Sequence, residues 1–283
     1  MANTEGKKRS GCRTVLIILL ILVVAIAAIV LIWFKANEDK IKETLTTPIS
    51  AITVGEEAAD FKVTTTDGQK VSMSDLLEGK DVAVVVLFAT WCGPCEKEFP
   101  EMDKVYRKYQ DKIGMIGLDI DVLDNDDAAR EYAESHDLSF PVAYTKDLPE
   151  SFKTSAYPTT VIIDRNGKIG CCRLGSIPDA ATFEKMVTTF IGDDYQERQL
   201  GYYTFYSYNK DYIQDIEFTV TSESGTQTYT TGKTGTADVF TDKPEDLKIK
   251  VISVPDGYKI DGNGETTSGL ISTYVKLPVS KEK

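Results

Sequence analysis

The stretch DVAVVVLFATWCGPC, residues 81–95, decides the fold of this chain. It begins with a nearly continuous run of apolar, mostly β-branched side chains, residues 81–89, which is typical of a central strand buried on both faces of a sheet. After Cys92, apolar residues recur at steps of three and four, and this spacing predicts an amphipathic helix. The two cysteines of the stretch therefore lie where a buried strand passes into a helix.

The position of Cys92 predicts a reactive thiol. Unpaired N–H groups and the helix dipole at a helix N-terminus stabilise a thiolate placed there. Cys95 lies one turn further on, so its sulfur can reach Cys92 to close or resolve a disulfide. Gly93 allows a substrate chain to approach closely, and Pro94 suits a first helical turn, where its missing N–H costs nothing. We expect Cys92 to be the exposed attacking thiol.

A Cys-x-x-Cys pair also occurs in zinc sites and in purely structural disulfides. The second half of a zinc site would have to be Cys171 and Cys172, but neighbouring strand residues point to opposite faces. A short loop gives a structural disulfide little entropic stabilisation. We therefore expect no metal. Cys171 and Cys172 are interpreted as one inward and one outward strand residue, with a vicinal disulfide or an accessory thiol that accepts oxidation from Cys92 as the alternative.

Composition excludes several other classes of function. The chain has 283 residues, with 44 acidic against 32 basic side chains, which disfavours a nucleic-acid partner because phosphate binding needs clustered Lys and Arg. The single histidine, His136, excludes mechanisms that need two imidazoles. We expect no cofactor beyond a redox-active disulfide between Cys92 and Cys95.

The N-terminus predicts a membrane anchor. Residues 15–34 contain no charged or strongly polar side chain, and as a helix they would rise about 30 Å, the thickness of a bilayer core. This run is longer than that of a secretory signal, so we expect it to be retained, with cleavage as the alternative. The positive-inside rule places residues 1–14 in the cytoplasm and residues 36–283 outside, because four basic residues precede the run: Lys7, Lys8, Arg9 and Arg13.

The remainder divides by composition into three parts. Residues 35–54 are polar and predict a linker. Residues 55–192 alternate between strand and helix patterns and close with a hairpin and a helix, which predicts an α/β fold with a mixed sheet. Residues 193–283 are rich in Thr, Tyr, Ser and Gly, and their alternating patterns predict a separate all-β domain.

Residues 55–192 resemble the thioredoxin superfamily, and within it the membrane-anchored redoxins of the TlpA and ResA type, which are similar to the AhpC/TSA group. The likeness rests on several segments: FATWCGPC, EKEFPEM, YPTT at 157–160, VIIDRNGKI and Gly175 before the last helix. It implies a thioredoxin fold in which Cys92 and Cys95 cycle between dithiol and disulfide. It also implies a cis Pro158 facing them and a Tyr157 backbone that pairs with a substrate peptide.

Three further positions near the cysteines bear on the expected chemistry. Val86 stands where cytoplasmic thioredoxins carry a buried carboxylate. Similarity to the ResA group implies that Glu98 instead helps to deprotonate the cysteine pair, the alternative being a solvated helix carboxylate. Trp91 is expected to shield the site, or else to be an ordinary core or surface aromatic residue.

The C-terminal part has a weaker resemblance of its own. Its T-x-x-x-G-x-A pattern, followed by a strand and PDGY, is similar to the Cna-B or SpaA prealbumin-like sandwiches of Gram-positive cell surfaces. Because no catalytic constellation is present in residues 193–283, we interpret this domain as a spacer or docking module.

These observations predict a membrane-anchored extracytoplasmic thiol-disulfide oxidoreductase that reduces protein disulfides. A reductant outside the membrane needs electrons from within, so a membrane dithiol carrier of the cytochrome c biogenesis type is the expected partner. Two alternatives remain. One is a thiol peroxidase, since residues 64–88 resemble the opening of peroxiredoxins, although FATW precedes Cys92 in place of their Pro-x-x-x-Thr-x-x-Cys loop. The other is a surface binding protein with a vestigial redox domain.

Overall fold

The computed structural model describes residues 18–19, 22–23, 26, 35, 50–193, 195–207, 212–269 and 274–282. The predicted cytoplasmic segment 1–14 lies outside these residues, as does almost all of the predicted span 15–34 and most of the linker 35–54. Within the described part of the chain, no helix has the length and apolar character needed to cross a bilayer. The chain divides into two units, residues 1–48 and 49–283, and every element below belongs to the second.

A five-stranded mixed sheet forms the centre of the first half of this unit, in the order β5-β4-β3-β6-β7. Strand β3 pairs in parallel with β4, and β4 with β5, whereas β6 is antiparallel to both β3 and β7. Every residue of β3 and β4 is buried, as their apolar runs predict. The strands are β3 Val82–Phe88, β4 Ile113–Asp119, β5 Val142–Tyr144, β6 Thr159–Asp164 and β7 Ile169–Leu174.

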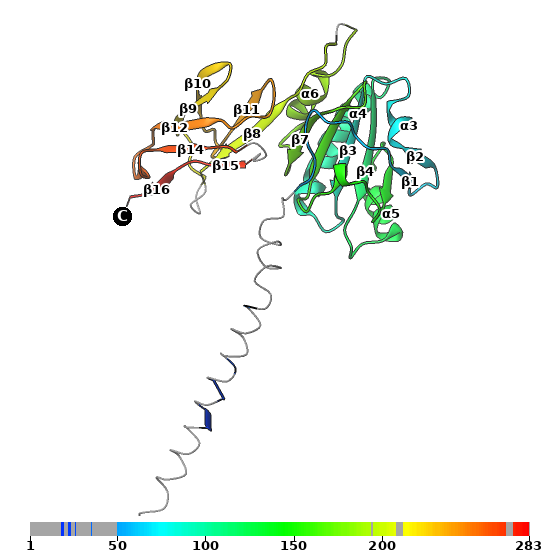
Figure 1. Cartoon of the computed structure of the whole chain (residues 1–283), viewed down its shortest axis with the longest axis horizontal. Coiled ribbons are helices and arrows are strands. Elements are labelled where there is room, and N and C mark those ends of the chain that lie inside the picture. Colours follow the sequence, from blue (N-terminus) through cyan, green and yellow to red (C-terminus); the bar gives the residue numbers. More distant parts are fainter. Residues whose placement is uncertain are drawn as a thin grey trace, which may run out of the picture. The chain divides into compact units, whose positions relative to one another are not determined.

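Helices and a hairpin cover the two faces of the sheet, which is drawn in cyan to green in Figure 1. The first apolar cluster joins Val84 and Val86 of β3 to α4 Gly93–Tyr109, α5 Asp126–Ser135 and α6 Ala180–Thr188. The second joins the alternate residues Val85 and Leu87 to the opposite layer. That layer consists of β1 Lys62–Thr64, β2 Lys70–Ser72, α3 Met73–Leu77 and the 3-10 turn η1 Glu150–Phe152. The predicted mixed α/β arrangement is confirmed.

Side-chain caps fix where three helices begin. Ser72 and Asp75 form a reciprocal capping box at α3, in which each side chain accepts a hydrogen bond from the backbone N–H of the other residue. Asn125 accepts hydrogen bonds from two N–H groups of α5, and Asp179 accepts one from Thr182 N of α6. His136 ends α5 and stacks on Tyr132.

The C-terminal part contains only strands among its described elements, shown in yellow to red in Figure 1. A four-stranded sheet has the order β10-β9-β12-β14, and a three-stranded sheet has the order β11-β8-β15. The two sheets share a third apolar cluster, in which the rings of Phe205 and Phe218 lie 5.2 Å apart. The strands are β8 Gly201–Tyr206, β9 Glu217–Ser222, β10 Gly225–Thr230, β11 Thr236–Thr241, β12 Lys248–Ser253, β13 Tyr258–Ile260, β14 Glu265–Thr267, β15 Tyr274–Lys276 and β16 Val279–Lys281.

Strand β8 contributes to the cores of both halves. Tyr202 belongs to the first apolar cluster with α4 and α6, whereas its neighbour Tyr203 belongs to the third. This division follows from the alternation of side chains along a strand. The chain approaches β8 along the edge of the five-stranded sheet, where Leu200 N donates a hydrogen bond to Gly170 O at 2.8 Å. The predicted boundary after residue 192 stays a prediction.

Candidate active site

The cysteine pair lies between β3 and α4, as the sequence predicts. Cys92 is the N-cap residue of α4, and its Sγ accepts a hydrogen bond from Cys95 N at 3.2 Å. The two sulfurs are joined in a disulfide. Cys95 is fully buried, and only 4% of Cys92 is accessible. The prediction that Cys92 is exposed is therefore wrong, because its side chain packs into the first apolar cluster and keeps only this small accessible fraction.

The loop before Cys92 is held by the carboxylate of Asp124, which lies in the connection between β4 and α5. Thr90 N and Thr90 Oγ1 donate hydrogen bonds to the two carboxylate oxygens of Asp124, at 2.9 and 2.8 Å. Cys92 N in turn donates to Ala89 O at 3.1 Å. These bonds fix the backbone on the N-terminal side of the disulfide, and the first turn of α4, with Gly93 and Pro94 exposed, fixes the other side.

The segment with Pro158 has the backbone form that the resemblance implied, since the peptide bond between Tyr157 and Pro158 is cis. Pro158 is buried and its carbonyl accepts a hydrogen bond from Gly175 N at 2.7 Å. Trp91 is 62% exposed, and its ring meets the ring of Tyr157 edge-on with centroids 5.8 Å apart. The indole thus forms surface beside the cysteines together with Tyr157.

Glu98 lies on the inner face of α4, one turn after Cys95. It is 2% exposed, and its Oε2 accepts a hydrogen bond from Ile177 N at 2.7 Å. Its Oε1 has no partner among the residues that the structure describes. Burial raises the pKa of Glu98 to about 8, against the smaller opposing effects of the Ile177 hydrogen bond and the Arg173 charge. The interpretation of Glu98 as a solvated helix carboxylate is wrong.

Two further buried ionisable residues were not predicted from the sequence. Asp119 ends β4 beside Phe88 of β3, is fully buried, and burial raises its pKa to about 7. Arg173 lies on β7 and is only 1% exposed. Both had a sequence signal, because each places a charge at an inward position of an otherwise apolar strand: Asp119 closes the run 113–119, and Arg173 follows Cys171 by two residues.

Cys171 and Cys172 lie on opposite faces of β7, and neither forms a disulfide. Cys171 belongs to the first apolar cluster and Cys172 packs against the second. The two side chains face opposite sides of the strand, as expected; Cys171 is buried, and Cys172 is partly exposed where it packs against the second cluster. Burial raises the pKa of both thiols, that of Cys171 to about 12, so neither readily forms a nucleophilic thiolate.

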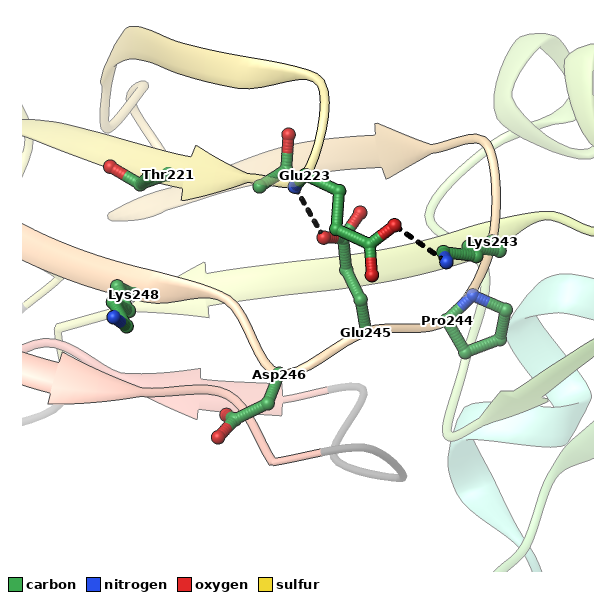
Figure 2. A pocket seen from close by; sticks show the side chains of 8 residues that line it. Thr221, Glu223, Lys243, Pro244, Glu245, Asp246 and Lys248 are labelled. Atoms are coloured by element: carbon green, nitrogen blue, oxygen red, sulfur yellow. Dashed lines mark hydrogen bonds and ion pairs between the residues drawn. The ribbon is translucent and has the colours of Figure 1, made fainter.

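A separate pocket lies on the C-terminal part and contains no residue of the cysteine site. It encloses about 510 Å³ and is lined by residues of β9, β12 and the connection before β12. Figure 2 shows Glu223 with its backbone N–H directed at Glu245 and its carboxylate directed at Lys243. The Lys243–Glu223 pair is 2.6 Å apart, so part of the charge in this pocket is already neutralised.

The fold and the site together define a class of protein. A disulfide at the junction of a central strand and a helix, next to a cis-proline segment and a buried carboxyl group, in a mixed sheet with helices, is the arrangement of a thioredoxin-fold thiol-disulfide oxidoreductase. Known proteins agree with this. The AhpC/TSA family matches residues 54–171.

The thiol-disulfide oxidoreductase ResA of a Bacillus cereus strain is 35% identical over 156 residues, which cover 54% of this chain and 82% of that protein. The thioredoxin-like protein YneN of Bacillus subtilis is 31% identical over 47% of this chain and 78% of that protein. The crystal structure of a thiol:disulfide interchange protein from Chlorobium tepidum TLS is 26% identical over 48% of this chain and 96% of that chain, with a TM-score of 0.42. The chain belongs to the ResA family of thiol-disulfide oxidoreductases.

The buried Glu98 predicts a specific pH dependence of stability. Its pKa is about 8 in the folded chain, against an ordinary value of 4.5. Between these values the folded state holds a proton that the unfolded state has lost, so the free energy of unfolding falls as pH rises through this window. Glu98→Gln removes this contribution. We expect the variant to gain a few kcal/mol on the wild type between pH 5 and pH 8, measured by urea unfolding of the oxidised chain.

The matched control is Glu96→Gln, an exposed carboxylate on the same helix. The free energy of unfolding of this variant should differ from that of the wild type by the same amount at pH 5 and at pH 8. If the free energy of unfolding of Glu98→Gln also differs from that of the wild type by the same amount at both pH values, the raised pKa of Glu98 is contradicted.

Proposed function

We propose that this oxidoreductase reduces disulfide bonds in proteins, with Cys92 as the attacking thiol and Cys95 as the resolving thiol. The Cys92 thiolate attacks one sulfur of the substrate disulfide, forms a mixed disulfide and releases the other substrate sulfur, which takes up a proton. The Cys95 thiolate then attacks Sγ of Cys92 and releases the second substrate thiol. Two electrons pass from the dithiol to the substrate, and the Cys92–Cys95 disulfide remains. No other cofactor is needed.

The placement of Cys92 at the start of α4 carries this proposal. Its Sγ already accepts the N–H of Cys95 at 3.2 Å, so the same group is in place to stabilise a thiolate. Cys92 is the more accessible of the two cysteines, and it lies next to the exposed Trp91. Attack by Cys92 and resolution by the buried Cys95 follow from this difference.

Glu98 supports the second step. A fully buried Cys95 cannot give its proton directly to bulk water, so it needs an acceptor inside the protein. Glu98 lies one helical turn away with an oxygen that has no partner among the described residues. Burial places its pKa at about 8, where a carboxyl group can both take and return a proton near neutral pH. We assign it as the proton acceptor of the dithiol.

The direction of electron flow is the reducing one in this proposal. The Gly93-Pro94 dipeptide between the cysteines resembles that of reducing thioredoxins, whose potential is about −270 mV. Each turnover leaves a disulfide that must be reduced again. We propose a membrane dithiol carrier of the cytochrome c biogenesis type as the source of these electrons.

Disulfide exchange can be tested with insulin as the substrate and dithiothreitol as the electron source. We expect Cys92→Ser to fall to the uncatalysed rate, because the attacking sulfur is lost. Glu98→Gln should lower the rate by about 10- to 100-fold at neutral pH, because proton transfer from Cys95 is impaired. Cys95→Ala should accumulate a mixed disulfide with Cys92.

Cys171→Ser serves as the control, and it should keep the wild-type rate. Peroxide consumption is measured in parallel. Disulfide reduction that survives Cys92→Ser, or peroxide consumption faster than insulin reduction, would overturn the proposed function.

We also propose that residues 15–34 anchor the chain and that residues 36–283 lie outside the cytoplasm. The apolar length and the four preceding basic residues support this orientation. Alkaline phosphatase fused after residue 283 should be active in intact cells, because this enzyme needs an oxidising compartment to form its disulfides. A β-galactosidase fusion at the same place should be inactive. The reverse pair of results would contradict the orientation.

For the C-terminal part we propose a sandwich of the Cna-B or SpaA type. The two sheets that share one apolar cluster support it, as does the T-x-x-x-G-x-A pattern that ends in β11. We expect an experimental structure of residues 201–279 to superpose on those sandwiches strand by strand. A match restricted to one of the two sheets would refute this assignment.

A further inference from the structure

A buried arginine joins the redox half of the chain to the C-terminal strands. Arg173 of β7 is 1% exposed, and its guanidinium lies over the rings of Tyr202 and Tyr274, at 4.1 and 4.4 Å from their centroids. Its Nη2 donates a hydrogen bond to Thr204 Oγ1 at 2.8 Å. Burying a charge is costly unless partners replace water. These three partners all come from strands β8 and β15 of the C-terminal part.

The partners of Arg173 are themselves fixed by pairing among the C-terminal strands. Thr204 donates its hydroxyl proton to Asp238 Oδ1 at 2.7 Å, and these residues lie opposite each other in the β8–β11 register. Tyr274 lies opposite Thr204 on the other side of β8. Tyr202 stacks on Phe240 of β11, with ring centroids 4.6 Å apart. The guanidinium therefore sits in a cage whose geometry the C-terminal sheet sets.

The residues after Arg173 lead from this cage directly to the redox site. Gly175 N donates to Pro158 O at 2.7 Å, and Ile177 N donates to Glu98 Oε2 at 2.7 Å. Between them, Ser176 O accepts hydrogen bonds from Arg173 Nη2 and from Tyr274 Oη, each at 3.2 Å. We call residues 173–177 the strap.

Tyr274 packs directly against the strap. Gly175 has a φ of +87°, and a Cβ added there would come within 2.3 Å of the Tyr274 ring. Glycine is therefore required for two reasons at this point, the left-handed backbone and the close approach of the tyrosine. A side chain of the C-terminal strands thus holds the backbone that contacts both Pro158 and Glu98.

We propose that Arg173 is a positioning residue for Glu98, and that the C-terminal strands, by holding Arg173 and the strap, tune proton transfer between Glu98 and the cysteine pair. The proposal rests on the proposed function, in which Glu98 takes the proton of Cys95. It gives the C-terminal part a role in the chemistry beyond that of a spacer or docking module.

The sign of the effect follows from the charges around Glu98. The positive charge of Arg173 on β7 opposes the rise in the pKa of Glu98 that burial causes. The other buried titratable groups in the same apolar cluster are Tyr132 of α5, Cys171 of β7, Tyr202 of β8 and the cysteine pair itself. The partly buried tyrosines packed against it are Tyr106, Tyr109, Tyr144, Tyr157 and Tyr195. All of these groups are neutral when protonated or oxidised. Loss or displacement of the guanidinium therefore makes Glu98 harder to ionise, and the reaction should need a higher pH.

The experiment compares the pH profile of insulin reduction by the full chain with that of its variants. Arg173→Met should move the pH of half-maximal rate upward by about one unit. Thr204→Val and Tyr274→Leu should produce part of this shift, because they loosen the cage and leave the charge. Arg173→Lys should restore most of the wild-type profile. Thr219→Val and Tyr229→Leu, which lie on β9 and β10 of the four-stranded sheet and not in the sheet that forms the cage, should leave the profile unchanged.

A double variant separates tuning from a general loss of structure. In a Glu98→Gln background, Tyr274→Leu should cause no further shift of the profile, because the group through which it acts is gone. The proposal is overturned if Thr204→Val and Tyr274→Leu both keep the wild-type profile, or if Tyr274→Leu shifts it equally without Glu98. Failure of the proposed function itself would show separately, as a wild-type chain that does not reduce insulin or a Glu98→Gln variant with the wild-type profile.

Discussion

The start of helix α4 is the constraint on which the rest of the site depends. The first N–H groups of any helix lack partners within the helix, and in this chain the sulfur of Cys92 accepts one of them. That requirement fixes Cys92 at the junction with β3, and the helical turn then brings Cys95 to it from within the core. Every residue of β3 is buried, so packing on both faces of the strand fixes the backbone that leads to Cys92.

Burial then assigns different roles to groups of similar chemistry. Cys92, Cys95 and Cys171 belong to the first apolar cluster, and Cys172 packs against the second. The sulfur of Cys92 accepts a backbone N–H, whereas the apolar surroundings of Cys171 and Cys172 disfavour their thiolates. Carboxylates divide in the same way. Glu96 and Glu98 are two residues apart on α4, but Glu96 is exposed whereas Glu98 points inward, where burial raises its pKa.

Much of this could be predicted from the sequence because its signals are local. The apolar run 81–89 predicts its strand, the spacing after Cys92 predicts its helix, and the pattern near the end of residues 55–192 predicts a hairpin. The structure has each of these elements. The burial of Glu98, Asp119 and Arg173 depends on what packs against them from elsewhere. Sequence periodicity could place Arg173 on an inner face, but not show that tyrosines from β8 and β15 would surround it.

Strand β8 has a consequence for how such a chain can change over evolutionary time. The consecutive residues Tyr202 and Tyr203 pack into two different apolar clusters. Strand β8 is therefore not a linker at which one half of the chain could be replaced without changing the core of the other. A chain cut back to the end of α6 would leave a gap against α4 and α6 where Tyr202 had been. Any segment that replaced the C-terminal strands would therefore have to fill the place of Tyr202 in the first apolar cluster with a side chain of similar size.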